Sequence, residues 1–550
     1  MSIKEVLHTN NVWSDKYLAI SVGAIMVLLT IQHWGNVIYL NYGPRKPGSI
    51  LRRVMQYRRA GARFLKKEVL GISLERWSLY SIYWAFNLIL ALTDLDLTSL
   101  KYVAKRFGCI LSSRISVTNF VLLVFLALKN TPLAPLSGHS YEKLRPLHKT
   151  AGYTCIFTTF LHASVYLSSY GISGDLENMR QTKNLAGVMA GLAMVILGLS
   201  TIAWLARNYY ELFYTIHIVM FLLIIILVGM HRPEFSSSTL SIIIFTACIW
   251  FADRLIRFVK LCWNLPRNHA TIYPMADGAV KVKLVRPIPC KPGSHVFLWM
   301  PSIRFFETHP FTLVSTDPAE FLIRKYDGYT GSLYEAAQNQ PGKVLRCSID
   351  GGYGQVPNFM DFDRVILVAG GSGSTFTFSI ALNMIKEATS SNVHKTIDFI
   401  WAVKRSESLQ WFEQEIHQLQ ESDHVNLFIY VTSDKTSEKT SEKTSEKRSD
   451  SLSLDSTGAI DDAEKGKEGM TYQAIGMPNI QYGRPDVFNL VDYCISQCGS
   501  ESRVGVGACG PTQMIRMARN AVSQETNDTG PSITFHTEVS DRAHYLKILK

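Results

Sequence analysis

Two stretches of equal length decide the fold of this chain: HKTAGYTCIFTTFLH at residues 148–162 and HIVMFLLIIILVGMH at residues 217–231. Each begins and ends with histidine, and most residues between are apolar. Since an α-helix turns about 100° per residue, fourteen residues fall only about 40° short of four turns. The two histidines of each stretch therefore lie on one helix face, about 21 Å apart along the axis.

Two such helices side by side predict a pair of haem sites. Polar groups are costly in hydrocarbon and usually have a function there. His148 with His217, and His162 with His231, would each give two imidazoles to one haem iron. The alternatives are histidines that act only as polar groups at helix ends, and a zinc or copper site. Each pair offers two imidazoles and neither a carboxylate nor a thiolate, which favours haem.

Apolar runs dominate the chain up to about residue 260 and predict a multi-pass helical membrane bundle. The first run is too long for the apolar part of a signal peptide and has no clear cleavage site, so we expect a membrane helix. The expected spans are 17–40, 73–95, 115–130, 149–169, 185–206, 211–230 and 237–257.

The formal net charge of +11 raises the question of nucleic-acid binding. Much of the excess, however, lies in the nine Lys and Arg residues between Arg45 and Lys67, and this segment follows the first span. The positive-inside rule accounts for such a segment, so we expect no nucleic-acid partner. The segment should face the cytosol, which puts the N-terminus outside or in a lumen and everything after residue 257 in the cytosol. The nine cysteines form no CxxC pair, which is typical of a reduced chain.

The half after residue 260 is expected to be soluble. Short alternating runs between Pro and Gly predict a β-barrel in 270–360, and strand and helix patterns predict a doubly wound α/β domain in 361–550. The segment 433–469 is polar, contains Lys-Thr-Ser-Glu three times, and is expected to be a disordered insert. The expected domains are 1–72, 73–260, 261–360 and 361–550.

Two motifs in the barrel region have the side chains that a flavin needs. The first is His309-Pro310-Phe311-Thr312, which offers an apolar wall, a hydroxyl and a donor for the pyrophosphate. The second, Gly328-Tyr-Thr330-Gly331-Ser332, offers backbone N–H groups to phosphate. Either motif alone is equally well explained as an ordinary β-turn.

The α/β region contains the pattern of a dinucleotide site. The turn Gly370-Gly371-Ser372-Gly373 follows an apolar strand and precedes a helical pattern, which is the context for holding a pyrophosphate. Lys404 and Arg405 follow the next strand and suit the 2′-phosphate of NADPH, although solvated charges are the simpler alternative.

A second turn is expected at the nicotinamide. Cys509-Gly510-Pro511 ends a late strand and would face the nicotinamide, with Cys509 beside the reacting carbon. A cysteine in such a strand is otherwise a core residue.

Taken in order, these motifs resemble the ferric reductase and NADPH oxidase superfamily. The matching elements are the two histidine pairs, Asp253-Arg254, HPFT, GGSG and CGP. The resemblance implies a ferredoxin-reductase-like module with FAD on the barrel and NADPH on the α/β domain, and two b-type haems in the membrane. It also implies that Arg114 lies near the outer haem, where an interfacial snorkelling arginine is the alternative. Phe535 is a candidate for the aromatic residue that covers the flavin in related oxidases.

Two activities fit this electron path. A metalloreductase would pass electrons to Fe(III) or Cu(II) chelates across the membrane, and an oxidase would pass them to O₂ and release superoxide. The outer loops are short and hold no Cys or Met cluster, which weakens a dedicated metal site, although a chelate needs only an exposed haem edge. A non-enzymatic membrane scaffold is a third alternative. The plasma membrane and the endoplasmic reticulum remain alternative locations.

Overall fold

The computed structural model describes residues 23–39, 72–92, 112–174, 176–231, 237–433, 480–526 and 530–538, with isolated positions before residue 70. The chain divides into two compact units. One comprises residues 1–47, 60–263 and 353–355, and the other comprises 48–59, 264–352 and 356–550. Most of the basic segment and of the predicted insert lie outside the described residues.

The first unit is helical. Residues 23–39 form a helix. Two antiparallel strands of two residues each, β1 (Glu68–Val69) and β2 (Ile72–Ser73), precede the next helix. The longer helices are α3 (Leu74–Leu92), α5 (Ser112–Ala127), α7 (Tyr141–Ser173), α8 (Thr182–Ser200), α10 (Tyr210–His231) and α11 (Ser237–Asn264), and the shorter ones are α6 (Leu133–Ser137), η2 (Leu176–Arg180) and α9 (Ala203–Asn208).

Helices overlap each of the seven ranges in which a span was expected. Among the described residues, two helices are long and apolar enough to cross a membrane by length and composition, α8 and α10. The number of spans therefore stays a prediction.

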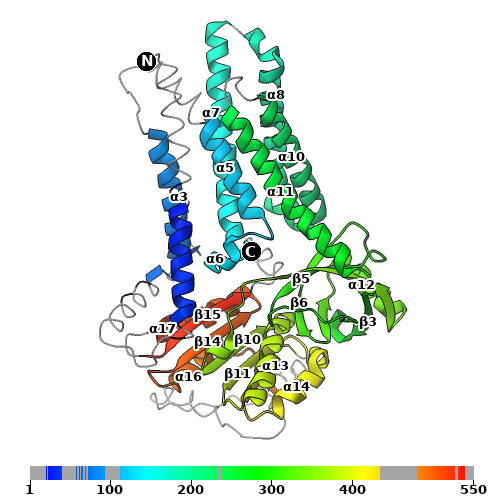
Figure 1. Ribbon diagram of the computed structural model, residues 1–550. Coiled ribbons are helices and arrows are strands. Elements are labelled where there is room, and N and C mark those ends of the chain that lie inside the picture. The colour runs from blue at the N-terminus through cyan, green and yellow to red at the C-terminus, as the bar shows by residue number, and fades with distance from the viewer. Residues whose placement is uncertain are drawn as a thin grey trace, which may run out of the picture. The chain divides into compact units, whose positions relative to one another are not determined.

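The helical unit is held together by close packing between neighbouring helices. α5 packs along α7 and α8 packs along α10 (Figure 1). Small side chains on α8 allow this approach, since Ala186, Ala190 and Ala193 are all buried. Ala193 and Met194 share an apolar cluster with Cys155 of α7 and Ile224 of α10. Cys155 and Ile224 each lie seven residues after the first histidine of their stretch, so this cluster fills the layer between the two histidine pairs.

The second unit begins with a seven-stranded antiparallel sheet in the order β8-β3-β4-β7-β6-β5-β9. Every strand contributes to one buried apolar cluster, which α12 also joins with Tyr329, Leu333 and Ala337. Its elements are β3 (His269–Met275), η3 (Ala276–Gly278), β4 (Ala279–Leu284), β5 (His295–Trp299), β6 (His309–Thr316), β7 (Ala319–Arg324), α12 (Tyr329–Asn339), β8 (Lys343–Arg346) and β9 (Ser348–Tyr353).

The rest of the second unit is a six-stranded parallel sheet in the order β13-β12-β11-β10-β14-β15. The first strand of this domain, β10, lies in the middle of the sheet. The next three strands, β11 to β13, lie on one side of it, and β14 and β15 lie on the other. The gap between β10 and β14 is therefore the topological switch point, where such sheets bind ligands at the carboxyl ends of the strands. The strands are β10 (Arg364–Gly370), β11 (Thr396–Val403), β12 (Val425–Val431), β13 (Ile480–Tyr482), β14 (Arg503–Cys509) and β15 (Ser532–Glu538). The helices are η4 (Phe359–Asp361), η5 (Gly371–Gly373), α13 (Ser374–Ser391), η6 (Ser406–Phe412), α14 (Glu413–Gln420), α16 (Val487–Ser496) and α17 (Thr512–Glu525).

Candidate functional site

The four predicted histidines form two facing pairs between α7 and α10. The ring centres of His148 and His217 lie 6.4 Å apart, and those of His162 and His231 lie 6.1 Å apart. Each pair joins residues that are far apart in the sequence, and the two pairs have nearly the same separation. The sequence periodicity thus predicted correctly which histidines meet.

Backbone carbonyls fix the orientation of one imidazole in each pair. Nδ1 of His148 lies 2.9 Å from the carbonyl oxygen of Leu123, and Nδ1 of His231 lies 2.8 Å from that of Lys183. Only an N–H group can donate to a carbonyl, so Nδ1 carries the proton in both rings and Nε2 keeps its lone pair. An imidazole held in this way is prepared to bind a metal ion through Nε2.

The two expected flavin motifs lie together. Residues 309–312 form the first half of β6 and pair with β5, whereas the pairing of β6 with β7 begins at Leu313. β6 is thus an inner strand of the sheet, but its first half, residues 309–312, is paired with β5 and has no pairing with β7. His309 stacks on Tyr329 with ring centres 4.5 Å apart, and Phe311 lies 6.2 Å from the same ring.

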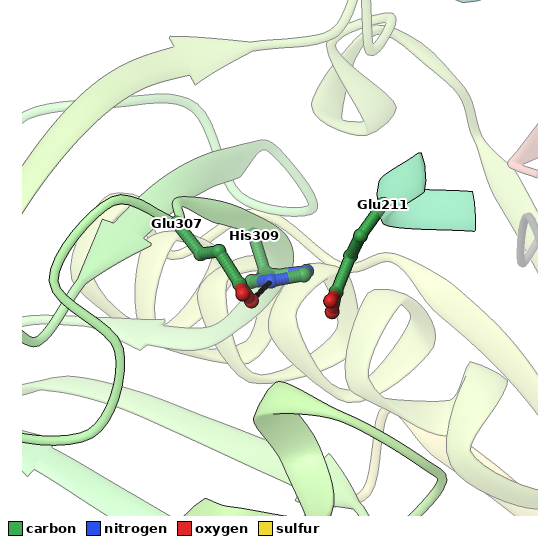
Figure 2. Close-up of side chains that lie close together, drawn as sticks. All are labelled: Glu211, Glu307 and His309. Atoms are coloured by element: carbon green, nitrogen blue, oxygen red, sulfur yellow. Dashed lines mark hydrogen bonds and ion pairs between the residues drawn. The ribbon is translucent and has the colours of Figure 1, made fainter. Parts of the chain in front are cut away.

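His309 also contacts a charged side chain, Glu307, which is paired with Arg304. Its Nε2 lies 3.0 Å from Glu307 Oε2, as Figure 2 shows, and Glu307 Oε1 accepts a 3.1 Å hydrogen bond from Arg304. Glu211, which is also drawn in that figure, belongs to the helical unit. The hydrogen bond to Glu307 holds the His309 ring against Tyr329, beside the part of β6 that has no pairing with β7.

The second flavin motif begins a helix. Gly328 precedes α12 with a φ of 65°, and the Thr330 hydroxyl accepts a hydrogen bond from the Tyr326 N–H. Gly331 packs so closely that an added Cβ would lie 3.0 Å from the Tyr326 carbonyl oxygen. Ser332 bonds back to the Gly328 carbonyl through both its N–H and its hydroxyl. The helix therefore starts beside His309, and the N–H groups of its first turn suit a phosphate. Tyr329 was not singled out from the sequence, because nothing but its place in this motif distinguishes it.

The two glycine turns of the α/β domain meet at the switch point. An added Cβ at Gly370 would collide with Pro511, and one at Gly510 would lie 2.8 Å from the Gly370 nitrogen. Gly371 has a φ of 56° and open space where a side chain would be, and the turn leads through Ser372 and Gly373 into α13. The structure therefore has the strand, turn and helix that a bound pyrophosphate requires.

Cys509 lies at the carboxyl end of β14, directly beside the first turn. An added Cβ at Gly373 would lie 2.5 Å from the Cys509 carbonyl oxygen and 3.1 Å from its Sγ. Burial, and then the charge of Glu538, raise the pKa of the Cys509 thiol to about 12. The neutral thiol is therefore the form present at physiological pH, and it suits a packing role beside the cofactor better than a nucleophilic one.

The predicted 2′-phosphate residues follow β11, as expected. Lys404 and Arg405 are both exposed. Arg405 is not simply solvated, because its Nη1 lies 3.3 Å from Oδ1 of Asp277 in the antiparallel domain. Arg324 Nη2 lies 3.3 Å from Oδ2 of the same carboxylate, so Arg324 and Arg405 share Asp277.

Two residues suggested by resemblance have different outcomes. The Arg114 side chain lies outside the described residues. Phe535 packs against the core of the α/β domain, with the Arg519 guanidinium 5.9 Å from its ring, so its ring contributes to that core. The next residue, His536, stacks on Phe376 of α13 at 5.8 Å.

Three family models match this chain in succession. A ferric reductase like transmembrane component matches residues 112–228, an FAD-binding domain matches 263–357, and a ferric reductase NAD binding domain matches 362–523. The second model covers every strand of the antiparallel sheet, and the third covers every strand of the parallel sheet except β15.

Several curated relatives match this chain at low identity. A probable cell surface ferric reductase of Aspergillus oryzae is 27% identical over 55% of this chain and 44% of its own length. Ferric/cupric reductase transmembrane component 1 of Candida albicans is 22% identical over 80% and 58%, and ferric reductase transmembrane component 6 of Saccharomyces cerevisiae is 25% identical over 82% and 64%. The match thus spans less than two thirds of each relative's length. The three domain matches, in this order along one chain, show that the protein belongs to the ferric reductase superfamily.

Proposed function

We propose that this chain is a transmembrane NADPH-dependent metalloreductase, which passes electrons from NADPH through FAD and two b-type haems to a ferric or cupric chelate across the membrane. The observation that carries the proposal is the pair of facing histidine couples at 6.4 and 6.1 Å. The names of the relatives, ferric and ferric/cupric reductases, support the choice of acceptor.

The spacing of the histidines suits one metal between each pair. A metal–imidazole bond is roughly 2 Å, and a ring nitrogen lies roughly 1 Å from its ring centre, so two coaxial ligands have ring centres about 6 Å apart. Both separations agree with this value. The Nδ1 contacts of His148 and His231 leave Nε2 as the ligand atom. On this assignment His148 and His217 would hold one haem, and His162 and His231 would hold the other.

The second unit would bind the two organic cofactors. Thr312, Phe311 and His309 would face the flavin, and the start of α12 would take its phosphates. The turn from Gly370 to Gly373 would hold the pyrophosphate of NADPH, with Lys404 and Arg405 at its 2′-phosphate. Bound FAD supplies the change from two-electron to one-electron transfer, since it accepts a hydride and releases electrons singly, whereas a haem accepts one.

The chain's own residues would then position the donor and exclude water. α13 begins at the nucleotide turn and its Ser379 hydroxyl accepts a 3.0 Å hydrogen bond from the Gly293 N–H of the flavin domain. Gly293 itself packs on Phe376, since an added Cβ would lie 2.9 Å from that ring. These contacts join the two cofactor domains through one helix. Buried Cys509 would contribute bulk beside the nicotinamide without adding charge.

We further propose that the FAD and NADPH domains are cytosolic and that the N-terminus is outside or lumenal. The basic segment between Arg45 and Lys67 supports this orientation. The acceptor would then meet the haem held by His162 and His231. The membrane would be the plasma membrane or the endoplasmic reticulum, with a role in iron or copper homeostasis.

The test is to purify the full chain with haem and FAD, add NADPH, and supply a ferric chelate, a cupric chelate or O₂ separately. We expect two b-type haems per chain and faster reduction of the metal chelates. Superoxide as the main product would identify an NADPH oxidase instead. The His162→Ala variant should lose one haem and keep the other, and unchanged haem content would refute the ligand assignment.

A further inference from the structure

Asp277 connects the flavin domain to the residues expected at the 2′-phosphate. It lies in the turn between β3 and β4 with a φ of 49°, a left-handed conformation that Asp tolerates better than most residues. Its side chain is only 9% exposed. A carboxylate so deeply buried must be held by donors, and the structure supplies them from β7 and from the segment that leads into and includes η6.

The donors are Arg324, Arg405 and Ser408. Arg324 Nη2 lies 3.3 Å from Oδ2, the Ser408 hydroxyl donates to Oδ2 at 3.0 Å, and Arg405 Nη1 lies 3.3 Å from Oδ1. Buried Trp411 fixes the turn itself, since its Nε1 donates a 2.7 Å hydrogen bond to the carbonyl of Ala276. The carboxylate of Asp277 is thus held in place whether or not Arg405 is bound to it.

Arg405 differs from the other two donors because its side chain is 54% exposed and it lies two residues after the end of β11. We propose that Asp277 is a specificity-determining residue that competes with the 2′-phosphate of NADPH for Arg405. The inference rests on the proposed function, in which Arg405 receives that phosphate. A carboxylate and a phosphate repel each other, so a guanidinium shared between them binds the phosphate less strongly than a free one.

Two consequences follow from this competition. NADPH withdraws Arg405 from Asp277 and so removes one contact between the two cofactor domains, whereas NADH leaves that contact in place. The preference of the chain for NADPH over NADH is also smaller than it would be if Arg405 had no contact with Asp277. An ion pair with an exposed partner is weak, so the expected effect of the competition is about two- to fivefold in affinity.

The experiment measures nucleotide binding to the full-length, FAD-loaded protein in detergent by calorimetry. The probes are adenosine 2′,5′-bisphosphate and 5′-AMP, which differ only in the 2′-phosphate and cannot donate electrons. The Asp277→Asn variant should bind the bisphosphate about two- to fivefold more tightly, with 5′-AMP unchanged. Asp277→Gly should behave the same, and glycine also suits the positive φ, so a folding defect of the first variant would not decide the result.

Two further variants separate the explanations. In an Arg405→Gln background, Asp277→Asn should have no effect, because the contested group is gone. Ser408→Ala loosens the same carboxylate but leaves its charge, so it should leave both affinities unchanged. If Ser408→Ala reproduces the gain, loosening of the turn is the cause and the competition is refuted.

The remaining outcomes separate a failure of the proposed NADPH site from a failure of the proposed competition. If Arg405→Gln weakens neither probe, Arg405 does not bind the 2′-phosphate, and the proposed NADPH site is wrong at that residue. If Arg405→Gln selectively weakens the bisphosphate but Asp277→Asn leaves it unchanged or weakens it too, the NADPH site stands and the competition is refuted.

Discussion

Gly187 leaves no room for a side chain beside His231: an added Cβ would lie 2.5 Å from Nδ1 of His231. That nitrogen lies 2.8 Å from the carbonyl oxygen of Lys183, which is on the same helix as Gly187. The glycine therefore allows α8 to approach His231 closely enough to orient its ring. His148 of the other pair receives the same support from α5, through its contact with the carbonyl oxygen of Leu123.

The Gly187→Ala variant is expected to lose the haem assigned to His162 and His231 and to keep the one assigned to His148 and His217. In an exposed helix this change would stabilise the protein by about 1 kcal/mol, because alanine is the better helix former. Here the new methyl group would push His231 away from Lys183 and tilt the ligand. Gly191→Ala is the matched control, since an added Cβ at Gly191, one turn later on α8, meets nothing within 4 Å. Haem content and the reduced spectrum measure the result, and equal spectra for the two variants would contradict it.

NADPH preference should depend on Lys404 and Arg405. Replacing both with glutamine is expected to raise KM for NADPH about 10- to 150-fold, because a charge-assisted contact to phosphate is worth about 1.5–3 kcal/mol. KM for NADH should change much less. The measurement is steady-state reduction of a ferric chelate with each nucleotide. Equal increases for both nucleotides would exclude a 2′-phosphate role for these residues.

Cys509 should be unreactive in the folded protein at moderately alkaline pH. Burial and Glu538 raise its pKa from 9.0 to about 12, so the neutral thiol is favoured in the folded state and the thiolate appears first in the unfolded state. This thiol therefore stabilises the fold below pH 9, and the contribution falls as the pH rises toward 12. Below pH 9 the thiolate fraction should be roughly 1000-fold lower than in the unfolded chain. Iodoacetamide labelling read by mass spectrometry should modify Cys509 at pH 8.5 only after denaturation, and rapid labelling of the native protein would contradict the burial.

The sequence predicted those parts of the site that depend on local periodicity. The facing of His148 with His217 follows from helical spacing, and the Gly370–Gly373 turn follows from an apolar strand before a helical pattern. The contact between Asp277 and Arg405 could not be predicted in this way, because it joins residues 128 positions apart in different domains. The strand order of the antiparallel sheet could not be predicted either, since it depends on long-range pairing. The segment 433–469 stays a prediction, as nearly all of it lies outside the described residues.

The direction of electron transfer is the most general prediction. The nucleotide domains follow α11 in the sequence, and the basic segment predicts that they are cytosolic. The two histidine couples are separated along their helices by 14 residues, so two haems there would lie at two depths of the bilayer. In sealed vesicles of known orientation, NADPH on the cytosolic face should therefore reduce an impermeant ferric chelate on the opposite face. The His231→Ala variant should keep flavin reduction and inner-haem reduction but lose this transfer. Reduction of the chelate on the same face as NADPH, at a rate that does not depend on His231, would mean that the chain is a flavin reductase with a membrane anchor.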